Sequence, residues 1–173
     1  MGLEQTVYAI NKTVNFYENL LNSVSEEEFK KTPADGVWSY SEVFSHLFRS
    51  NMSCFTAIER CSKGQGIEDS KATKLKYKLV LFFRRFPPNM RFKVPEKLAH
   101  LVEKIDKTEA GKMISDFRNG LATITEQVRN ASPTQKLKHP RMELLNARDW
   151  LIFIEVHTKH HARQLKRIMK MLG

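Results

Sequence analysis

Two histidines near the carboxyl end of the chain, His157 and His161, have the spacing of a metal-binding pair. Four residues apart on a helix, they lie roughly 40° apart around its axis and about 6 Å apart along it, so both project from one face. Neutral imidazoles at such positions can bind one divalent ion at about 2.0–2.1 Å. The same pattern also fits two partly buried histidines that are hydrogen-bonded across a bundle.

A third ligand has to come from another segment, and His46 is the candidate. On a helical wheel it lies at the edge of an apolar stripe, near Ser50 and Ser53, where a histidine is not needed to fill a core. Small polar neighbours leave room for water or substrate beside a metal. The alternative is a boundary histidine without a ligand role. His160 lies about 60° back from His157 on the wheel, and we expect it to face solvent.

Helices are predicted throughout, and four long ones would position these histidines. Apolar residues recur at three- and four-residue steps in residues 4–21, 39–63 and 108–130 and from residue 146 almost to the end. We expect a short helical turn after Ser25 and either a short helix or an irregular arm at residues 74–86. Residues 89–107 are expected to be mostly loop, and no strand of useful length is predicted.

The spacing of these helices predicts an all-α four-helix bundle. More than forty residues separate the second long helix from the third, which indicates a long crossover and an up-down-down-up arrangement. Two helix starts carry capping signals, Ser39 with Glu42 and Asn146 with Asp149. Glu42 also lies one turn before His46 and could orient that ring, although the capping role is the simpler interpretation.

Length and composition favour one domain over residues 1–173. With 173 residues, 41% of them apolar, the chain can bury a substantial core without disulfides or a structural metal. No apolar run approaches the roughly 20 residues of a membrane span, and the start lacks a basic and apolar leader. Cys54 and Cys61 would lie about 10.5 Å apart on one helix, too far for a disulfide. We therefore expect a cytoplasmic protein.

Most of the net charge of +10 comes from one segment, because residues 71–95 contain eight basic residues and no acidic one. Cations alternate there with aromatic residues, as in surfaces that bind nucleic acid or anionic membranes. A crossover that must cover a bundle and still face water explains the lysines without any partner, and we expect nucleic-acid binding to be the weaker interpretation. The segment could also attract an anionic substrate.

Several motifs together resemble the DinB/YfiT-like superfamily. The run from Trp38 to Leu47 is similar to that family's second-helix motif, in which a tryptophan precedes a capped helix and its histidine. The His139-Pro140 pair, the tryptophan helix start at Asp149-Trp150, and the His157 to Gln164 segment resemble the C-terminal pattern. One departure is Glu143, where related sequences usually have glycine.

The resemblance implies a metal centre and the fold that holds it. The expected ligands are His46, His157 and His161, the expected metal is nickel or zinc, and family members commonly form homodimers. Gln164, one turn beyond His161, could contact a ligand or serve simple hydrogen bonding within the bundle. No general acid or base can be assigned from the sequence.

Three imidazoles leave a divalent metal with open positions for chemistry. The resemblance therefore implies a thiol-dependent transferase in which a low-molecular-weight thiol attacks a small electrophilic substrate. The alternatives are a hydrolase that uses metal-bound hydroxide and a bundle that binds metal or nucleic acid without catalysis.

Overall fold

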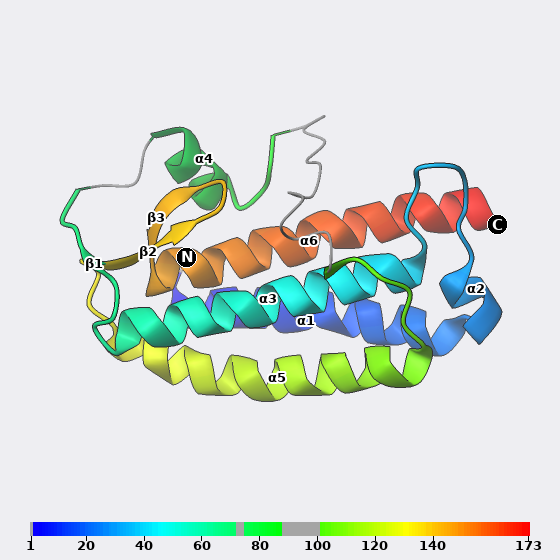
Figure 1. The fold of residues 1–173 in the computed structure, drawn as a ribbon, viewed down its shortest axis with the longest axis horizontal. Helices are drawn as coiled ribbons and strands as arrows, with labels where there is room; N and C mark the ends of the chain where they lie inside the picture. Colours follow the sequence, from blue (N-terminus) through cyan, green and yellow to red (C-terminus); the bar gives the residue numbers. More distant parts are fainter. Residues whose placement is uncertain (1, 72–74, 88–100) are drawn as a thin grey trace.

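Four long helices dominate the computed structural model, which describes residues 2–71, 75–87 and 101–173. They are α1 (Leu3–Ser23), α3 (Tyr40–Ser62), α5 (Lys107–Asn130) and α6 (Ala147–Leu172). Two short helices accompany them, α2 (Glu26–Lys30) and α4 (Leu75–Phe83). The predicted four-helix bundle is confirmed, with helix boundaries within two or three residues of those expected (Figure 1).

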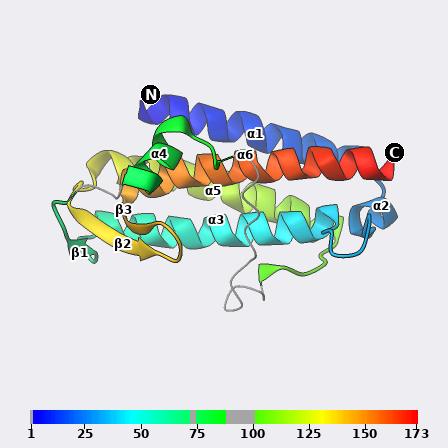
Figure 2. The same cartoon turned by 90° about the horizontal axis from the view of Figure 1, so that it is seen from above.

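The bundle has the predicted up-down-down-up arrangement. In Figures 1 and 2, α1 and α6 run in one direction, whereas α3 and α5 run in the other. Helix α3 packs against α5 and α6, and α1 packs against the same two helices from the opposite side. Helices α3 and α5 can run in the same direction because the long segment between them returns the chain to the end of the bundle where α3 began.

Local signals start and end the helices that carry the histidines. The Ser39 side chain accepts a bond from the Glu42 amide, and the Glu42 carboxylate accepts one from the Ser39 amide at 2.8 Å. At the start of α6, Asn146 Oδ1 accepts from the Asp149 amide at 2.9 Å. Gly64, with φ +69°, follows the end of α3 in a conformation that favours glycine.

A small antiparallel sheet lies beside the bundle, so the expectation of a chain without strands was wrong. Its strands, in spatial order, are β1 (Ile67–Glu68), β2 (Gln135–His139) and β3 (Glu143–Asn146). Strands this short carry no useful alternation, and the pairing of β1 with β2 joins segments far apart in the sequence. Glu143, the first residue of β3, has φ +65°, the region in which glycine is least strained.

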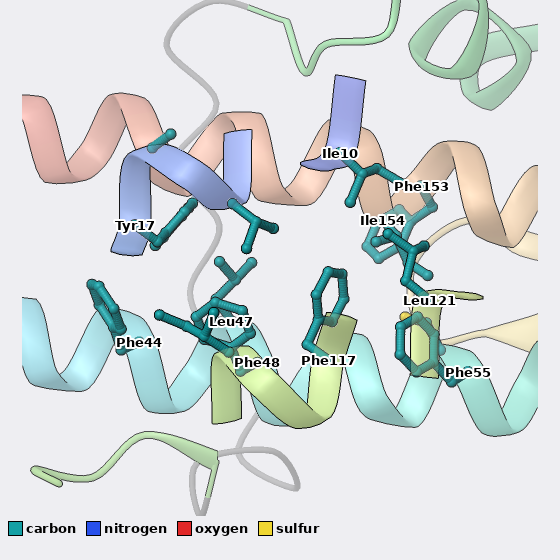
Figure 3. Packing of buried hydrophobic residues seen from close by; sticks show 14 of the residues in the cluster. Ile10, Tyr17, Phe44, Leu47, Phe48, Phe55, Phe117, Leu121, Phe153 and Ile154 are labelled. Atoms are coloured by element: carbon teal, nitrogen blue, oxygen red, sulfur yellow. The ribbon is translucent and has the colours of Figure 1, made fainter. Parts of the chain in front are cut away.

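Aromatic rings from α1, α3 and α5 fill the centre of the bundle (Figure 3). Tyr17 packs edge-on against Phe44 and Phe48, and Phe48 packs against Phe117. The buried Tyr17 hydroxyl donates to the Thr158 carbonyl at 2.8 Å, which joins α1 to α6. These contacts fix the position of α6 relative to α3, and with it the relative position of the histidines.

The segment between α3 and α5 is hydrogen-bonded to α3 just before α5 begins. Residues 75–83 form helix α4, which is one of the two structures expected for that stretch, whereas most of the loop predicted at 89–107 lies outside the described residues. Before α5, Ser41 and Ser45 bond to the backbone of Ile105 and Glu103. Within the described ranges, no helix is both long and apolar enough to cross a membrane.

Candidate metal centre

Helices α3 and α6 bring three imidazoles together. Ring nitrogens of His46, His157 and His161 all lie within 4.8 Å of one another, and the three side chains are buried. His46 comes from the second turn of α3, and the other two lie on the face of α6 that packs against it. Two bonds of about 2.0–2.1 Å to a common ion can span a nitrogen separation of up to about 4.2 Å, so small side-chain movements suffice to complete the set.

Amide oxygens hold the outer nitrogens of two of these rings. His157 Nδ1 lies 3.0 Å from Asn51 Oδ1, and His161 Nδ1 lies 2.7 Å from Gln164 Oε1. The orientation of Asn51 is supported independently, because its Nδ2 donates to Thr158 Oγ1 at 3.2 Å. An amide oxygen can only accept, so His157 Nδ1 carries the proton, and with the Gln164 amide oxygen facing the other ring, His161 Nδ1 carries it as well.

The inner nitrogens then face each other as lone pairs. His157 Nε2 and His161 Nε2 lie 3.0 Å apart, and with both protons on Nδ1 neither can donate to the other. Two lone pairs at this distance repel unless a cation lies between them. The donor set therefore fits a divalent ion, with the tautomers already fixed by Asn51 and Gln164.

Burial keeps the three rings neutral. It lowers the pKa of His46 to about 4 and, together with the charge that neighbouring imidazoles would carry, lowers the pKa values of His157 and His161 well below their usual range. A protonated imidazole has no lone pair to offer a metal, so neutrality is the state that ligation requires.

Aromatic side chains enclose the cluster. Trp38 stacks on His161 with ring centroids 6.3 Å apart, and its centroid lies 5.2 Å from that of His46. Phe153 stacks on His157 from the other side. His46 Nδ1 is buried and has no hydrogen-bond partner among the described residues.

The other candidate residues divide into those near the histidines and those engaged elsewhere. Gln164 contacts His161 directly, whereas the Glu42 carboxylate is bound to the amide and hydroxyl of Ser39 at the start of α3. His160 was expected in solvent but is partly buried, because the chain after α4 brings Phe86 edge-on against its ring.

Sequence reasoning missed Asn51. It lies five residues after His46 and reads as one more polar position on α3, although it is fully buried. A polar residue among the apolar positions of a helix is a signal for a buried hydrogen-bond partner.

Cys54 and Cys61 are free and buried. Burial raises the pKa of the Cys54 thiol to about 12, which makes this thiol unreactive.

Comparison with models of known families assigns the chain to one of them. The model of the DinB superfamily matches residues 10–165, which is most of the sequence. The chain belongs to the DinB superfamily. A relative within reach of sequence comparison is the uncharacterized protein YuaE of Bacillus subtilis (strain 168), 25% identical over 154 residues that cover 89% of this chain and 91% of YuaE.

Solved structures share this DinB-superfamily fold at low sequence identity. YfiT from Bacillus subtilis, described as a probable metal-dependent hydrolase with an unusual four-helix bundle topology, is 12% identical with a TM-score of 0.65. That match covers 99% of this chain and 87% of YfiT. TT2238, a four-helix bundle protein, is 14% identical with a TM-score of 0.61, and the match covers 96% of this chain and 99% of TT2238.

A third structure with this fold is the mycothiol-dependent maleylpyruvate isomerase, which is 15% identical with a TM-score of 0.58. The match covers 95% of this chain but 61% of the isomerase. These likenesses show a shared fold, and the described residues of this chain that could hold a metal ion are His46, His157 and His161.

Proposed function

We propose that His46, His157 and His161 bind one divalent metal ion, zinc or nickel, in an enzyme that acts on a small molecule. The observation that carries the proposal is the pair of inner nitrogens 3.0 Å apart, with the outer nitrogens held by Asn51 and Gln164. A purely structural histidine pair would place a donor opposite an acceptor. With the Gln164 amide oxygen facing His161 Nδ1, this pair places two acceptors opposite each other.

A divalent ion held by three imidazoles retains open coordination positions. It would lower the pKa of a bound thiol or water toward neutral pH. The protein's own contribution is to keep the imidazoles neutral and oriented and to exclude bulk water with Trp38 and Phe153. The nearby carboxylates have other roles: Glu42 caps α3, and the buried Glu155 binds Arg84 and Lys159. Among the residues that the structure describes, no carboxylate is therefore assigned as a base for the nucleophile.

The activity we propose first is thiol transfer. The sulfur of a small thiolate would attack an electrophilic carbon, the leaving group would depart with its electron pair, and the thiol proton would pass to solvent. The fold likeness to a mycothiol-dependent isomerase supports a thiol cosubstrate. The second candidate is hydrolysis of a small ester or amide, which the likeness to YfiT supports.

One experiment separates the two activities. Protein loaded with zinc or nickel is assayed with 1-chloro-2,4-dinitrobenzene plus L-cysteine or glutathione, and separately with 4-nitrophenyl acetate without thiol. Thiol transfer predicts a metal-dependent rate in the first assay, with release of chloride, and hydrolysis predicts one in the second.

The His157→Ala variant is the control for both assays, because it removes one proposed ligand. If the loaded wild type is no faster than this variant in either assay, neither of the two proposed activities is supported.

A further inference from the structure

A cavity lies on the outer side of α6, under helix α4, away from the histidine cluster. It has a volume of about 990 Å³, within the range of small-molecule sites, and its walls come from α4, the start of β2 and one face of α6. The face of α6 involved carries Asp149, Ile152, Lys159 and Arg163. The cavity is therefore built from segments far apart in the sequence.

This face of α6 is not the one that carries the imidazoles. Lys159 follows His157 by two residues, and Arg163 follows His161 by two, which places each about 200° around the helix from its neighbouring histidine. The residues that line the cavity include none of the three histidines. The cavity is a separate place in the fold, and a ligand there would not compete for the imidazoles.

Positive charge gathers around this cavity. Seven cations line it, against one acidic residue, Asp149. The cations come from the segment around α4, from β2 and from α6: Lys71, Lys78, Arg84, Arg85, Lys136, Lys159 and Arg163.

The acids nearby do not neutralise this group. The buried carboxylate of Glu155 is shared by Arg84 and Lys159, and Asp69 Oδ2 lies 3.5 Å from Lys136 Nζ. No ion pair joins Lys78, Arg85 or Arg163 to an acidic residue within the described ranges. Like charges gathered at one cavity repel one another, and an anion bound among them would relieve that repulsion.

Two of the cations are built into the protein. The Lys136 side chain is buried, and its ammonium group donates to the Lys71 carbonyl. Arg84 also bonds to Thr6 Oγ1 at 2.9 Å, and its backbone has φ +50°, a conformation that costs free energy for a residue with a side chain. Both are held in place, in contrast to lysines on a solvated surface.

The cavity also has an apolar wall. Phe82 and Phe83 line it, although their side chains are 77% and 59% exposed. An inorganic anion would leave these rings uncovered, whereas a ligand with an aromatic or apolar group would cover them.

We propose that this cavity binds a phosphorylated small molecule that also carries an aromatic or apolar group. Arginine and lysine are the residues that recognise phosphate, and the excess of cations matches a ligand with two or more negative charges. The phosphates would contact Lys78, Arg85 and Arg163, and the apolar group would lie against Phe82 and Phe83. The limited volume and the buried Lys136 favour a small molecule over an extended polymer or a membrane surface.

Calorimetric titration of the full-length protein with ADP and with inorganic pyrophosphate tests the proposal. We expect ADP to bind, and pyrophosphate to bind more weakly because it cannot reach the rings. The double variant Lys78→Gln/Arg163→Gln removes two exposed charges that form no ion pair with a described residue, and it should weaken ADP binding by tenfold or more. Phe82→Ser should weaken binding of ADP but not of pyrophosphate.

The matched control is Lys12→Gln/Lys170→Gln, which removes the same charge outside the cavity and should leave the dissociation constant unchanged. Equal weakening in the control would show a general charge effect and overturn the proposal, as would no binding of ADP at 1 mM. Binding of a short DNA duplex or of anionic vesicles that ADP cannot displace would assign the surface to a macromolecule instead. Metal content, measured in the same samples, should not differ between the variants.

Discussion

His157 and His161 turn their Nε2 atoms toward each other at 3.0 Å, while Asn51 and Gln164 hold the opposite nitrogens. With the Gln164 amide oxygen toward His161, each inner nitrogen is an acceptor that faces an acceptor, and a cation between them would stabilise both rings. Buried polar groups without a partner lower stability, and proteins retain such groups mainly where they have a function. The predictions below follow from this relationship and from the packing that supports it.

The amide side chains should set the affinity of the metal site. Gln164→Leu and Asn51→Leu remove the acceptors that hold the outer nitrogens, so the imidazoles lose their fixed tautomers and orientations. We expect metal affinity to fall by about 10- to 100-fold in each variant. Competition with a chromogenic chelator measures it, and Gln127→Leu, the same change at a residue of α5, should leave the affinity unchanged.

Metal removal should lower thermal stability. An ion that binds the folded state at a free concentration a hundred times its dissociation constant adds about 2.7 kcal/mol to the free energy of unfolding. For a chain of this length that corresponds to about 5 to 10 °C in Tm. Calorimetry of loaded and chelator-treated protein measures the difference, which should vanish in His157→Ala.

The stability of the metal-free protein should fall as the pH decreases from 6.5 toward 4. Burial lowers the pKa of His139 to about 4, and the Nδ1 atom of this ring accepts bonds from the amides of Arg141 and Met142. Above pH 6.5 the ring is neutral in both the folded and the unfolded state. Between pH 6.5 and 4 the unfolded chain takes up a proton that the folded ring does not, so stability is lost.

This loss should amount to about 1.4 kcal/mol per pH unit for His139. Urea unfolding at pH 7.5 and 5.5 measures it. The His139→Asn variant keeps an acceptor near the Nδ1 position but cannot titrate, so its stability should depend less on pH. An unchanged pH dependence would show that His139 does not contribute.

Packing between α3 and α5 should depend on a glycine. A Cβ on Gly120 would lie 2.7 Å from Cε2 of Phe55, whose ring stacks on Phe117. We expect Gly120→Ala to lower the free energy of unfolding by about 1 to 3 kcal/mol. Gly111→Ala is the matched control on the same helix, because its Cβ would meet Leu21 at an ordinary 3.9 Å. That variant should gain about 0.5 to 1 kcal/mol, and equal effects at both positions would contradict the packing argument.

Local signals predicted the bundle well. The capping pairs at Ser39 and Asn146 and the apolar stripes fixed the long helices because these features act within a few residues of one another. The direction of α5 followed from the length of the crossover. Strand β1 could not be predicted, since its pairing joins residues 67 and 68 to residues 135 and 136, and the β2–β3 hairpin is built from strands too short to show a clear alternation.

The candidate site was predictable as far as the types and spacing of its histidines. The α6 spacing places His157 and His161 on one face whatever the tertiary fold, whereas the approach of His46 depends on how α3 packs against α6. The contacts of Asn51 with His157 and of Trp38 with His161 could not be predicted from the sequence, because they join separate segments of the chain. Glu143 is a related case, because its positive φ occurs where β3 begins, directly after the tight turn from β2.

The most direct test of the metal centre is elemental analysis of the protein purified without a histidine tag or a nickel column. We predict one zinc or nickel ion per chain in the wild type. The variants His46→Ala, His157→Ala and His161→Ala should lose it while their far-ultraviolet circular dichroism stays helical, and His160→Ala should keep it. A wild type that cannot be loaded with either ion, or full metal content in all three ligand variants, would contradict the assignment.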